Sequence, residues 1–360
     1  MEVHPMTVKT IAVALAAMLS AGSGVITAPS HADAAFVIYL APRGANVNDG
    51  RTQETAVRTL ERVEQIAATA TTDVEVRIAQ GTYNIGHTKW DTYIPGHTIT
   101  FMPVDYQTGE GVDSIADRPV FRGGGADWWF EARLPAGHPG GVTGLRFYYL
   151  QVEQYARGGI LIHGGYTTVD GMRVPSTTGA NGNTFYGMYF RQLGSAWTSA
   201  EGFGVGAIDL VNSSDNLIRA NHFTYLMNST PDESHIHGVY AAHGSSRNQI
   251  MNNSFRYITG APVNFRNASN ANEVTGGTFQ YAGIKSYYSE FFCGPTCQIT
   301  HTGGGECPSQ NNQFYDNDLI SGYHGDDIPL VLLYPADVTH AAAPDAVGAC
   351  GSRVYVHGNE

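Results

Sequence analysis

Residues 216–223 read NLIRANHF, and residues 248–255 repeat the pattern as NQIMNNSF. In both segments an asparagine is followed by an apolar residue two positions later and by phenylalanine seven positions later. The pattern recurs in segments that begin at Asn183, Asn272 and Asn312, the last of which has leucine in the final position. Self-similarity of this kind is the sequence signature of a repeat protein.

The five asparagines follow one another at intervals of 33, 32, 24 and 40 residues. We interpret 24 residues as one bare coil and the excess as loops. Short alternating strands in each unit cannot cover their own apolar side, so stacking the units would bury one continuous core. Asparagine suits the bends because it tolerates unusual backbone angles and bonds to neighbouring backbone. The repeat therefore predicts a parallel β-solenoid, because the alternative, a β-sandwich, has no reason to repeat this motif in phase.

The N-terminal part of the chain fits the beginning of such a stack. Residues 35–40 are predicted to form a strand, and residues 52–70 show helical spacing, with Leu60, Val63 and Ile66 on one side. A helix at the open end of a solenoid shields the apolar stack from water. We therefore predict one domain over residues 35–360 with a short N-terminal capping helix.

Three N-terminal segments carry a resemblance to a known group. They are FVIYLAPRGANVNDGRTQETAVRTLERVEQI at 36–66, VRIAQGTYN at 76–84 and RPVFRGGG at 118–125. This region resembles that of secreted right-handed parallel β-helix proteins of the pectin-lyase-like group, which includes pectate, alginate and chondroitin lyases. The resemblance implies an all-β, single-stranded right-handed parallel β-helix. It does not choose the substrate, because this fold hosts lyases, hydrolases, epimerases and binding proteins.

The composition narrows the class of partner. The chain has 20 Lys and Arg against 32 Asp and Glu, which gives a net charge of −12 at pH 7. Nucleic acid is not a predicted partner, because phosphate binding needs a concentrated basic face. An acidic polysaccharide remains compatible, since local arginines can hold a carboxylate inside an acidic protein. We expect a monomer.

Residues 1–34 read as a secretory signal peptide, with Lys9 before an apolar run over 11–21 and an Ala-x-Ala site at 32–34. The run is too short to span a membrane. Secretion, extracellular or periplasmic, makes disulfides the expected state of the four cysteines, Cys293, Cys297, Cys307 and Cys350. Three pairings are open, and a zinc site that includes His301 is the alternative.

The strands before each repeat motif define a candidate groove. Alternation sends every second side chain outward. Aligned on the motifs, the residues predicted to share the outward face are His163, Asp209, Tyr240, Asn264, Arg266, Tyr288 and Glu290. Insertions at 191–204, 227–236 and 293–307 flank this face and would form walls of a groove.

Proton abstraction next to a carboxylate needs a group that neutralises the carboxylate, a base and an acid. We predict that Arg266 neutralises it with Asn264 beside it, that His237 is the base and that Tyr240 is the acid. The alternative is that Tyr240 acts as the base with an arginine beside it. His243 borders the groove as a further catalytic candidate. Further substrate-binding candidates are Arg256, Asp209 and Glu290. The family's Lys–Arg pair and its aspartate-bound calcium have no convincing counterpart here, so no catalytic residue is taken from the resemblance.

The predicted function is a secreted polysaccharide lyase that cleaves a uronate-containing polysaccharide by β-elimination. No metal and no other cofactor is expected, with Ca²⁺ as the open alternative because oxygen-rich turns can hold it. A glycoside hydrolase that uses Asp209 and a second carboxylate is the rival enzyme. A non-catalytic glycan-binding protein is the rival from another class.

Overall fold

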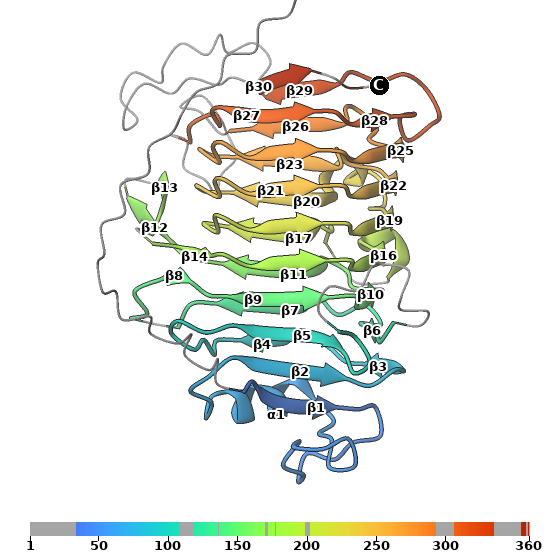
Figure 1. The fold of residues 1–360 in the computed structure, drawn as a ribbon. Helices are drawn as coiled ribbons and strands as arrows, with labels where there is room; N and C mark the ends of the chain where they lie inside the picture. The colour runs from blue at the N-terminus through green and yellow to red at the C-terminus, as the bar shows by residue number, and fades with distance from the viewer. Residues whose placement is uncertain are drawn as a thin grey trace, which may run out of the picture. The chain divides into compact units, whose positions relative to one another are not determined.

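The computed structural model describes most of the chain after residue 33. The described residues are 34–107, 118–135, 137–169, 172–176, 178–198, 202–292, 306–334, 354–357 and 359. They form a stack of coils in which the chain passes through three parallel sheets in turn (Figure 1). The architecture is a parallel β-helix, as the repeat predicted.

The first sheet has ten strands and carries the repeat motif. In order they are β1 (Phe36–Leu40), β2 (Val74–Ile78), β5 (Ile99–Pro103), β9 (Leu145–Tyr148), β15 (Thr184–Tyr186), β18 (Leu217–Arg219), β21 (Gln249–Met251), β24 (Glu273–Thr275), β27 (Asn312–Tyr315) and β30 (Val354–His357).

The second sheet has eight strands. They are β3 (Thr82–Asn84), β6 (Val120–Arg122), β10 (Gln151–Glu153), β16 (Tyr189–Leu193), β19 (His222–Leu226), β22 (Ser254–Ile258), β25 (Thr278–Ala282) and β28 (Asp318–Leu319).

The third sheet, also of eight strands, carries the candidate groove. Its strands are β4 (Thr88–Trp90), β7 (Trp128–Arg133), β11 (Gly158–His163), β17 (Gly206–Val211), β20 (His237–Ala242), β23 (Val263–Arg266), β26 (Tyr288–Phe291) and β29 (Val331–Tyr334).

Short elements lie beside the three sheets. The antiparallel pair β12 (Tyr166–Val169) and β13 (Met172–Pro175) forms one two-stranded sheet, and β8 (Gly141–Val142) with β14 (Ala180–Asn181) forms another. Single turns of 3₁₀ helix occur at η2 (Ser195–Trp197) and η3 (Glu233–His235).

The predicted N-terminal helix is present but shorter than expected. It forms α1 (Leu60–Ala67), and the side chain of Thr59 caps it by accepting a hydrogen bond from the backbone of Arg62. Its buried residues include Leu60, Val63 and Ile66, as the spacing predicted, and it contacts β1 and β4. Within the described ranges, none of the helices combines the length and the apolar character needed to cross a bilayer.

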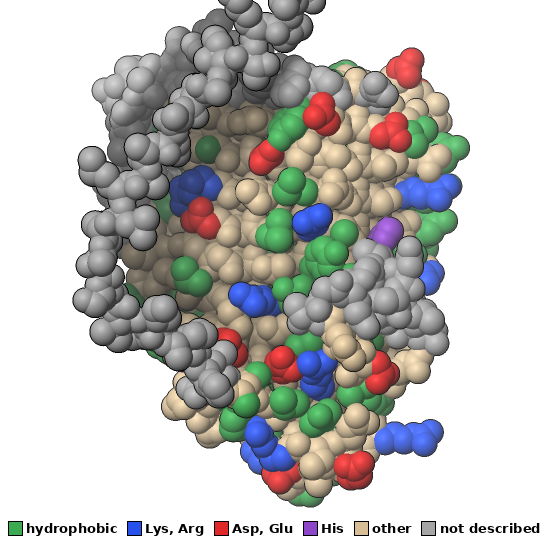
Figure 2. All heavy atoms as spheres, in the orientation of Figure 1, with side chains coloured by type: hydrophobic (Ala, Val, Ile, Leu, Met, Phe, Trp, Pro, Cys, Tyr) green, Lys and Arg blue, Asp and Glu red, His purple; other side chains and the backbone are tan. Residues whose placement is uncertain are grey.

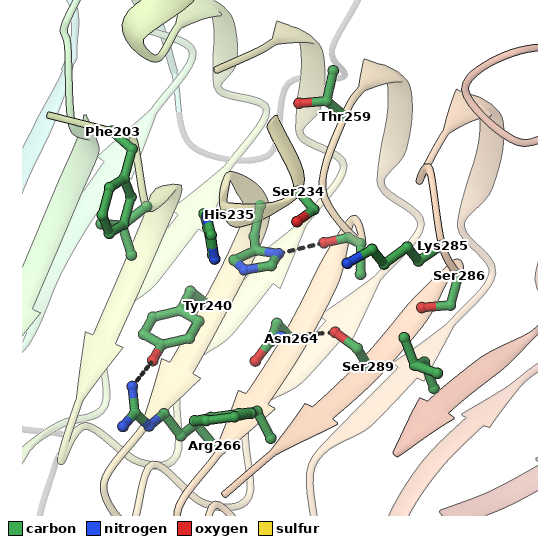
Figure 3. Close-up of a pocket in the computed structure, with 15 residues that line it drawn as sticks. Phe203, Ser234, His235, Tyr240, Thr259, Asn264, Arg266, Lys285, Ser286 and Ser289 are labelled. Atoms are coloured by element: carbon green, nitrogen blue, oxygen red, sulfur yellow. Dashed lines mark hydrogen bonds between the residues drawn. The ribbon is translucent and has the colours of Figure 1, made fainter. Parts of the chain in front are cut away.

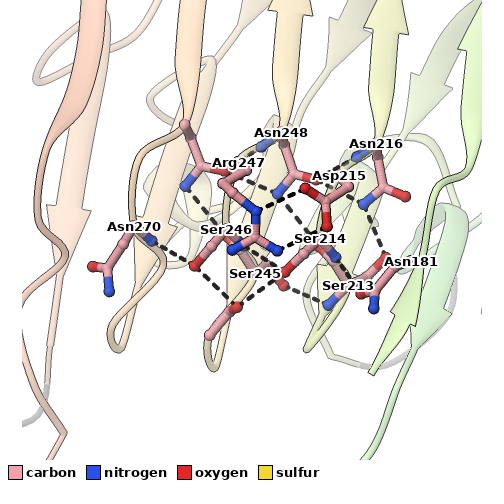
Figure 4. Close-up of polar contacts among 12 residues, drawn as sticks. Asn181, Ser213, Ser214, Asp215, Asn216, Ser245, Ser246, Arg247, Asn248 and Asn270 are labelled. Atoms are coloured by element: carbon pink, nitrogen blue, oxygen red, sulfur yellow. Dashed lines mark hydrogen bonds and ion pairs between the residues drawn. The ribbon is translucent and has the colours of Figure 1, made fainter. Parts of the chain in front are cut away.

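The motif asparagines stack into a buried ladder. Asn216 donates from both its backbone and its side-chain nitrogen to Oδ1 of Asn248, at 3.0 and 2.7 Å. Asn248 does the same to Asn272 at 2.9 Å in each case, and Asn272 to Asn312 at 2.8 and 3.1 Å. The side chains of all four are at most 1% exposed. Figure 4 shows part of the ladder beside a stack of serines from the same turns.

The phenylalanines of the motif form the matching ladder inside the coil. The ring centroids of Phe190 and Phe223 are 5.4 Å apart, those of Phe223 and Phe255 are 4.9 Å apart, and those of Phe255 and Phe279 are 4.7 Å apart. All four side chains are buried. Each motif thus supplies one polar and one apolar contact to the next coil, which explains why its two ends recur in phase.

Two sequence predictions concern residues outside the described ranges. The proposed signal peptide lies there except for Ala34, and so do all of the cysteines except Cys307. The cleavage site, secretion and the disulfides therefore stay predictions.

Candidate active site

A pocket of about 520 Å³ lies on the outer face of the third sheet, over β20, β23 and β26. Pockets for small ligands usually occupy about 300–1,000 Å³. In the strand register Tyr240 lies opposite Asn264, and Asn264 lies opposite Ser289. All three line the pocket (Figure 3). Because neighbouring strands are about 4.8 Å apart, one sugar can touch side chains from adjacent coils.

His237 begins β20 and lines one end of the pocket. Its Nδ1 is 2.7 Å from the carbonyl oxygen of Ala261. A carbonyl can only accept, so Nδ1 carries the proton and Nε2 keeps its lone pair. Burial lowers the pKa of His237 to about 4, so the imidazole is neutral at pH 7. This is the form that a general base requires.

Tyr240 lies beside His237 on the same strand, with the two rings nearly parallel and their centroids 5.6 Å apart. Its hydroxyl is 3.5 Å from Nη1 of Arg266. Burial raises the pKa of Tyr240 and outweighs the opposing effect of the Arg266 charge. The phenol therefore keeps its proton at neutral pH and has one to donate.

Arg266 forms an ion pair with Glu306 that the sequence did not predict. Its Nε and Nη2 donate to the two carboxylate oxygens of Glu306 at 2.9 and 2.8 Å. Glu306 is 1% exposed, and the Arg266 guanidinium also lies over the ring of Phe291 at 4.8 Å. Nη1 points to Tyr240. The arginine therefore orients the tyrosine and still has N–H groups for an anion.

Asn264 on β23 lies between Tyr240 on β20 and Ser289 on β26. Its Nδ2 donates to the hydroxyl of Ser289 at 2.7 Å, and its Oδ1 is buried without a hydrogen-bond partner among the described residues. A serine hydroxyl can accept or donate, so the amide can turn over and present its NH₂ group to the pocket. Asn264 can thus bind either an acceptor or a donor on a ligand.

The structure adds residues that the sequence reasoning missed. Lys285 is exposed and lines the pocket from the turn before β26, with Ser286 next to it. At the other side Phe203, 40% exposed, packs beside His235 with a centroid distance of 5.1 Å. Figure 3 places Phe203 and Lys285 on opposite sides of Tyr240 and Asn264. Phe203 and His235 belong to two of the insertions that the sequence predicted beside the groove. Those insertions were the one sequence signal that pointed to these residues.

Glu290 and Tyr288 do not face the groove, which corrects the prediction. Glu290 pairs in register with the core residue Phe265 and is 3% exposed. It accepts from the Tyr288 hydroxyl at 2.5 Å and from Nδ2 of Asn312 at 2.7 Å. Both bonds go to Oε1 of Glu290 and hold the carboxyl group inside the coil. Ser289 takes the outward position instead.

Arg256 and His243 were also predicted for the groove, and neither lines it. Arg256 belongs to β22 of the second sheet, where its guanidinium lies over the ring of Tyr257 at 5.2 Å. His243 is buried in the turn after β20 with a φ of 55°, and its Nδ1 is 2.9 Å from Nδ2 of Asn267. The turn takes His243 away from the strand face on which Tyr240 lies.

Asp209 lies opposite Tyr240 in the register, as predicted, but it does not line the pocket. Its side chain is 2% exposed, and its Oδ1 has no hydrogen-bond partner among the described residues. Burial raises the pKa of Asp209 well above the usual value. This arrangement disfavours a substrate-binding carboxylate or a nucleophile.

We expect Asp209→Asn to stabilise the protein at alkaline pH. A carboxyl whose pKa is raised by folding stabilises the native state below its unfolded pKa, and that contribution is lost as the pH rises through the folded value. Asparagine stays neutral, so its advantage should grow from pH 5 to pH 8. Calorimetric Tm values at both pH values test this, with exposed Asp105→Asn as the control. An equal Tm change at both pH values would contradict it.

The described lining of the pocket is basic, whereas the protein as a whole is acidic. Among the residues that the structure describes, the lining contains Arg266 and Lys285 and no aspartate or glutamate, although the whole chain carries −12. On the face in Figure 2 the basic side chains are scattered, some of them next to acidic ones, and do not gather in one patch. The local field therefore favours an anionic ligand.

The same lining does not fit a calcium site. Ca²⁺ takes six to eight oxygen ligands, usually with carboxylates among them. In the described parts of the chain, no three His, Cys, Asp or Glu side chains group in a way that could hold a metal ion.

Comparisons with known proteins found similar folds among solved structures. No protein family model and no curated protein matches the sequence. Among solved structures, the chain is similar to an alginate lyase from Paenibacillus sp. str. FPU-7, at 14% identity over 83% of this chain and 92% of that one, with a TM-score of 0.50. A rhamnogalacturonan lyase is 13% identical over 82% of this chain and 72% of that one, with a TM-score of 0.49.

An exopolygalacturonase from Yersinia enterocolitica is 11% identical over 91% of this chain and 66% of that one, with a TM-score of 0.41. At this identity the similarity to the alginate lyase shows a common fold and leaves the activity open. It agrees with the three parallel sheets described above, which make the chain a parallel β-helix.

Proposed function

We propose that this protein is a polysaccharide lyase that cleaves an acidic, uronate-containing polysaccharide by β-elimination. The observation that carries the proposal is the His237–Tyr240 pair. A neutral imidazole, whose Nε2 has no hydrogen-bond partner among the described residues, lies next to a protonated phenol. The described lining of this pocket holds cations and no carboxylate. The solved structures of similar fold include lyases, which supports the proposal of a lyase.

The elimination would proceed as follows. Nε2 of His237 takes the proton on the carbon next to the sugar carboxylate, and the electron pair forms a double bond to the neighbouring ring carbon. The glycosidic oxygen leaves that carbon and takes the proton of the Tyr240 hydroxyl. Asn264 and the remaining N–H groups of Arg266 stabilise the charge that develops on the carboxylate. Proton exchange with water restores both residues.

A hydrolase is the weaker alternative on this site. Glycoside hydrolysis needs two carboxyl groups on either side of the scissile bond. In the described part of the chain no carboxyl group lines the pocket, and Asp209 is buried beside it. The lining therefore provides a base and an acid for elimination but lacks the pair that hydrolysis requires.

The product of the reaction tests the proposal. Uronate polysaccharides incubated with the protein are expected to release chains with an unsaturated terminal sugar, which absorbs in the near ultraviolet. New reducing ends without that absorbance would indicate a hydrolase. Binding without either product would indicate a glycan-binding protein.

The low pKa of His237 predicts the pH dependence of the reaction. The base must be neutral, so kcat/KM should be constant above about pH 5 and fall as the pH approaches about 4. Tyr240 should not limit the rate at neutral pH, because its pKa is raised. Nuclear magnetic resonance titration of the His237 ring gives the same pKa directly. A ring that titrates near 6.5, the ordinary value for histidine, would contradict the prediction.

A further inference from the structure

The pocket has a second polar end, away from Arg266, that the elimination does not use. Lys285 is exposed there, and among the described residues it forms no ion pair. Arg266, by contrast, is neutralised by its two bonds to Glu306. The uncompensated positive charge of the pocket therefore belongs to Lys285.

Two buried hydroxyl groups lie at the same end. The backbone of Ile284 donates to the carbonyl oxygen of Thr259 at 3.0 Å, which fixes Thr259 in the coil next to Lys285 and Ser286. Thr259 is 3% exposed and Ser286 is fully buried, and both line the pocket. Neither hydroxyl has a hydrogen-bond partner among the described residues.

Unpartnered buried polar atoms are rare, because each has lost its hydrogen bonds to water without gaining one in the protein. Two of them beside an uncompensated ammonium group are explained if a ligand completes the set. Hydroxyl groups and an ammonium group can all donate, so the matching ligand is an anion with several acceptor oxygens.

We infer that Lys285, Thr259 and Ser286 form a subsite for the carboxylate of a second uronate unit, next to the unit that is cleaved. This rests on the proposed function and narrows its substrate class. The preferred polymer carries an acid group on neighbouring sugars, as a continuous polyuronate does. A polymer with uronates only at every second unit leaves the subsite empty.

The test compares Lys285→Met and Lys285→Arg with the wild type on a polyuronate, on its methyl ester and on a polymer of alternating uronate and neutral sugar. A charge-assisted contact is worth about 1.5–3 kcal/mol, so Lys285→Met should raise Kd and KM about 10-fold or more on the polyuronate. Lys285→Arg should recover most of this loss. On the other two polymers Lys285→Met should change little, and Lys89→Met, in a remote coil, should change nothing.

Affinity is measured by calorimetry, so the subsite is tested even if no elimination occurs. Loss of binding in Lys285→Met without any unsaturated product would reject the proposed function and keep the subsite. Elimination with an unchanged Kd and KM in Lys285→Met would reject the subsite alone. An equal loss on all three polymers would also reject it, because the effect would not depend on a second acid group.

Discussion

The His237→Gln variant is expected to fold and to lose a factor of about 10²–10⁴ in kcat, the usual contribution of a general base. The glutamine amide can still donate to the carbonyl oxygen of Ala261, so the contact that His237 makes through Nδ1 is preserved. It has no group that can take the sugar proton. The loss should therefore appear in kcat and leave the Kd for the polysaccharide nearly unchanged.

Tyr240→Phe is the companion variant. It keeps the ring beside His237 and removes only the hydroxyl that lies 3.5 Å from Arg266. We expect a comparable loss of kcat if this hydroxyl protonates the leaving oxygen. Lys89→Ala is the control for both, because Lys89 lies in β4, several coils away. Near-full activity in both pocket variants would place the reaction elsewhere.

Arg266→Ala is a poorer test of the chemistry than the His237 and Tyr240 variants. An outward arginine should contribute little to folding, but this one holds the buried carboxylate of Glu306. Removing one partner of a buried ion pair typically costs about 3–5 kcal/mol. Loss of activity in this variant could follow from unfolding alone, so circular dichroism must accompany the assay.

The second large effect is expected from Asn248→Ala, which should destabilise the fold by about 3 kcal/mol or more. Oδ1 of Asn248 accepts both nitrogens of Asn216, and its Nδ2 donates to Ser213 and Asn272. Alanine leaves these partners unpaired inside the protein, at about 1–3 kcal/mol for each group that finds no other partner.

Urea unfolding measures the Asn248→Ala effect, with Asn84→Ala as the matched control. Asn84 is exposed on β3, so its replacement should change the free energy of unfolding by less than about 0.5 kcal/mol. A similar small change for Asn248 would mean that the ladder contributes specificity of stacking and little stability.

The stacking of the coils could be predicted because it depends on local repetition. A parallel coil meets its neighbour residue for residue, so Asn216, Asn248 and Asn272 must coincide if their motifs do. The same register put Tyr240 beside Asn264 and pointed both outward. Alternation along a strand needs no knowledge of the rest of the chain.

Positions outside this regular pattern could not be predicted. Glu290 was expected to face outward because aligning the strands on the repeat and alternating their side chains put it there. Only the positions of Asn312 and Tyr288 reveal that its Oε1 accepts hydrogen bonds inside the coil. Arg256 was assigned to the groove because the sequence did not show which of the three sheets its strand joins.

By itself the sequence determined the repeating coil, its asparagine and phenylalanine ladders and the face that carries His237 and Tyr240. The insertions that contain Phe203 and His235 were also predicted beside this face, whereas the contacts of Lys285 and Arg266 came only from the three-dimensional arrangement. Lys285 enters the pocket from a turn, where no alternation applies, and Arg266 meets Glu306 across 40 residues of sequence. The coil is fixed by contacts that recur at every repeat, whereas the charge of the pocket depends on single contacts that no repeat encodes.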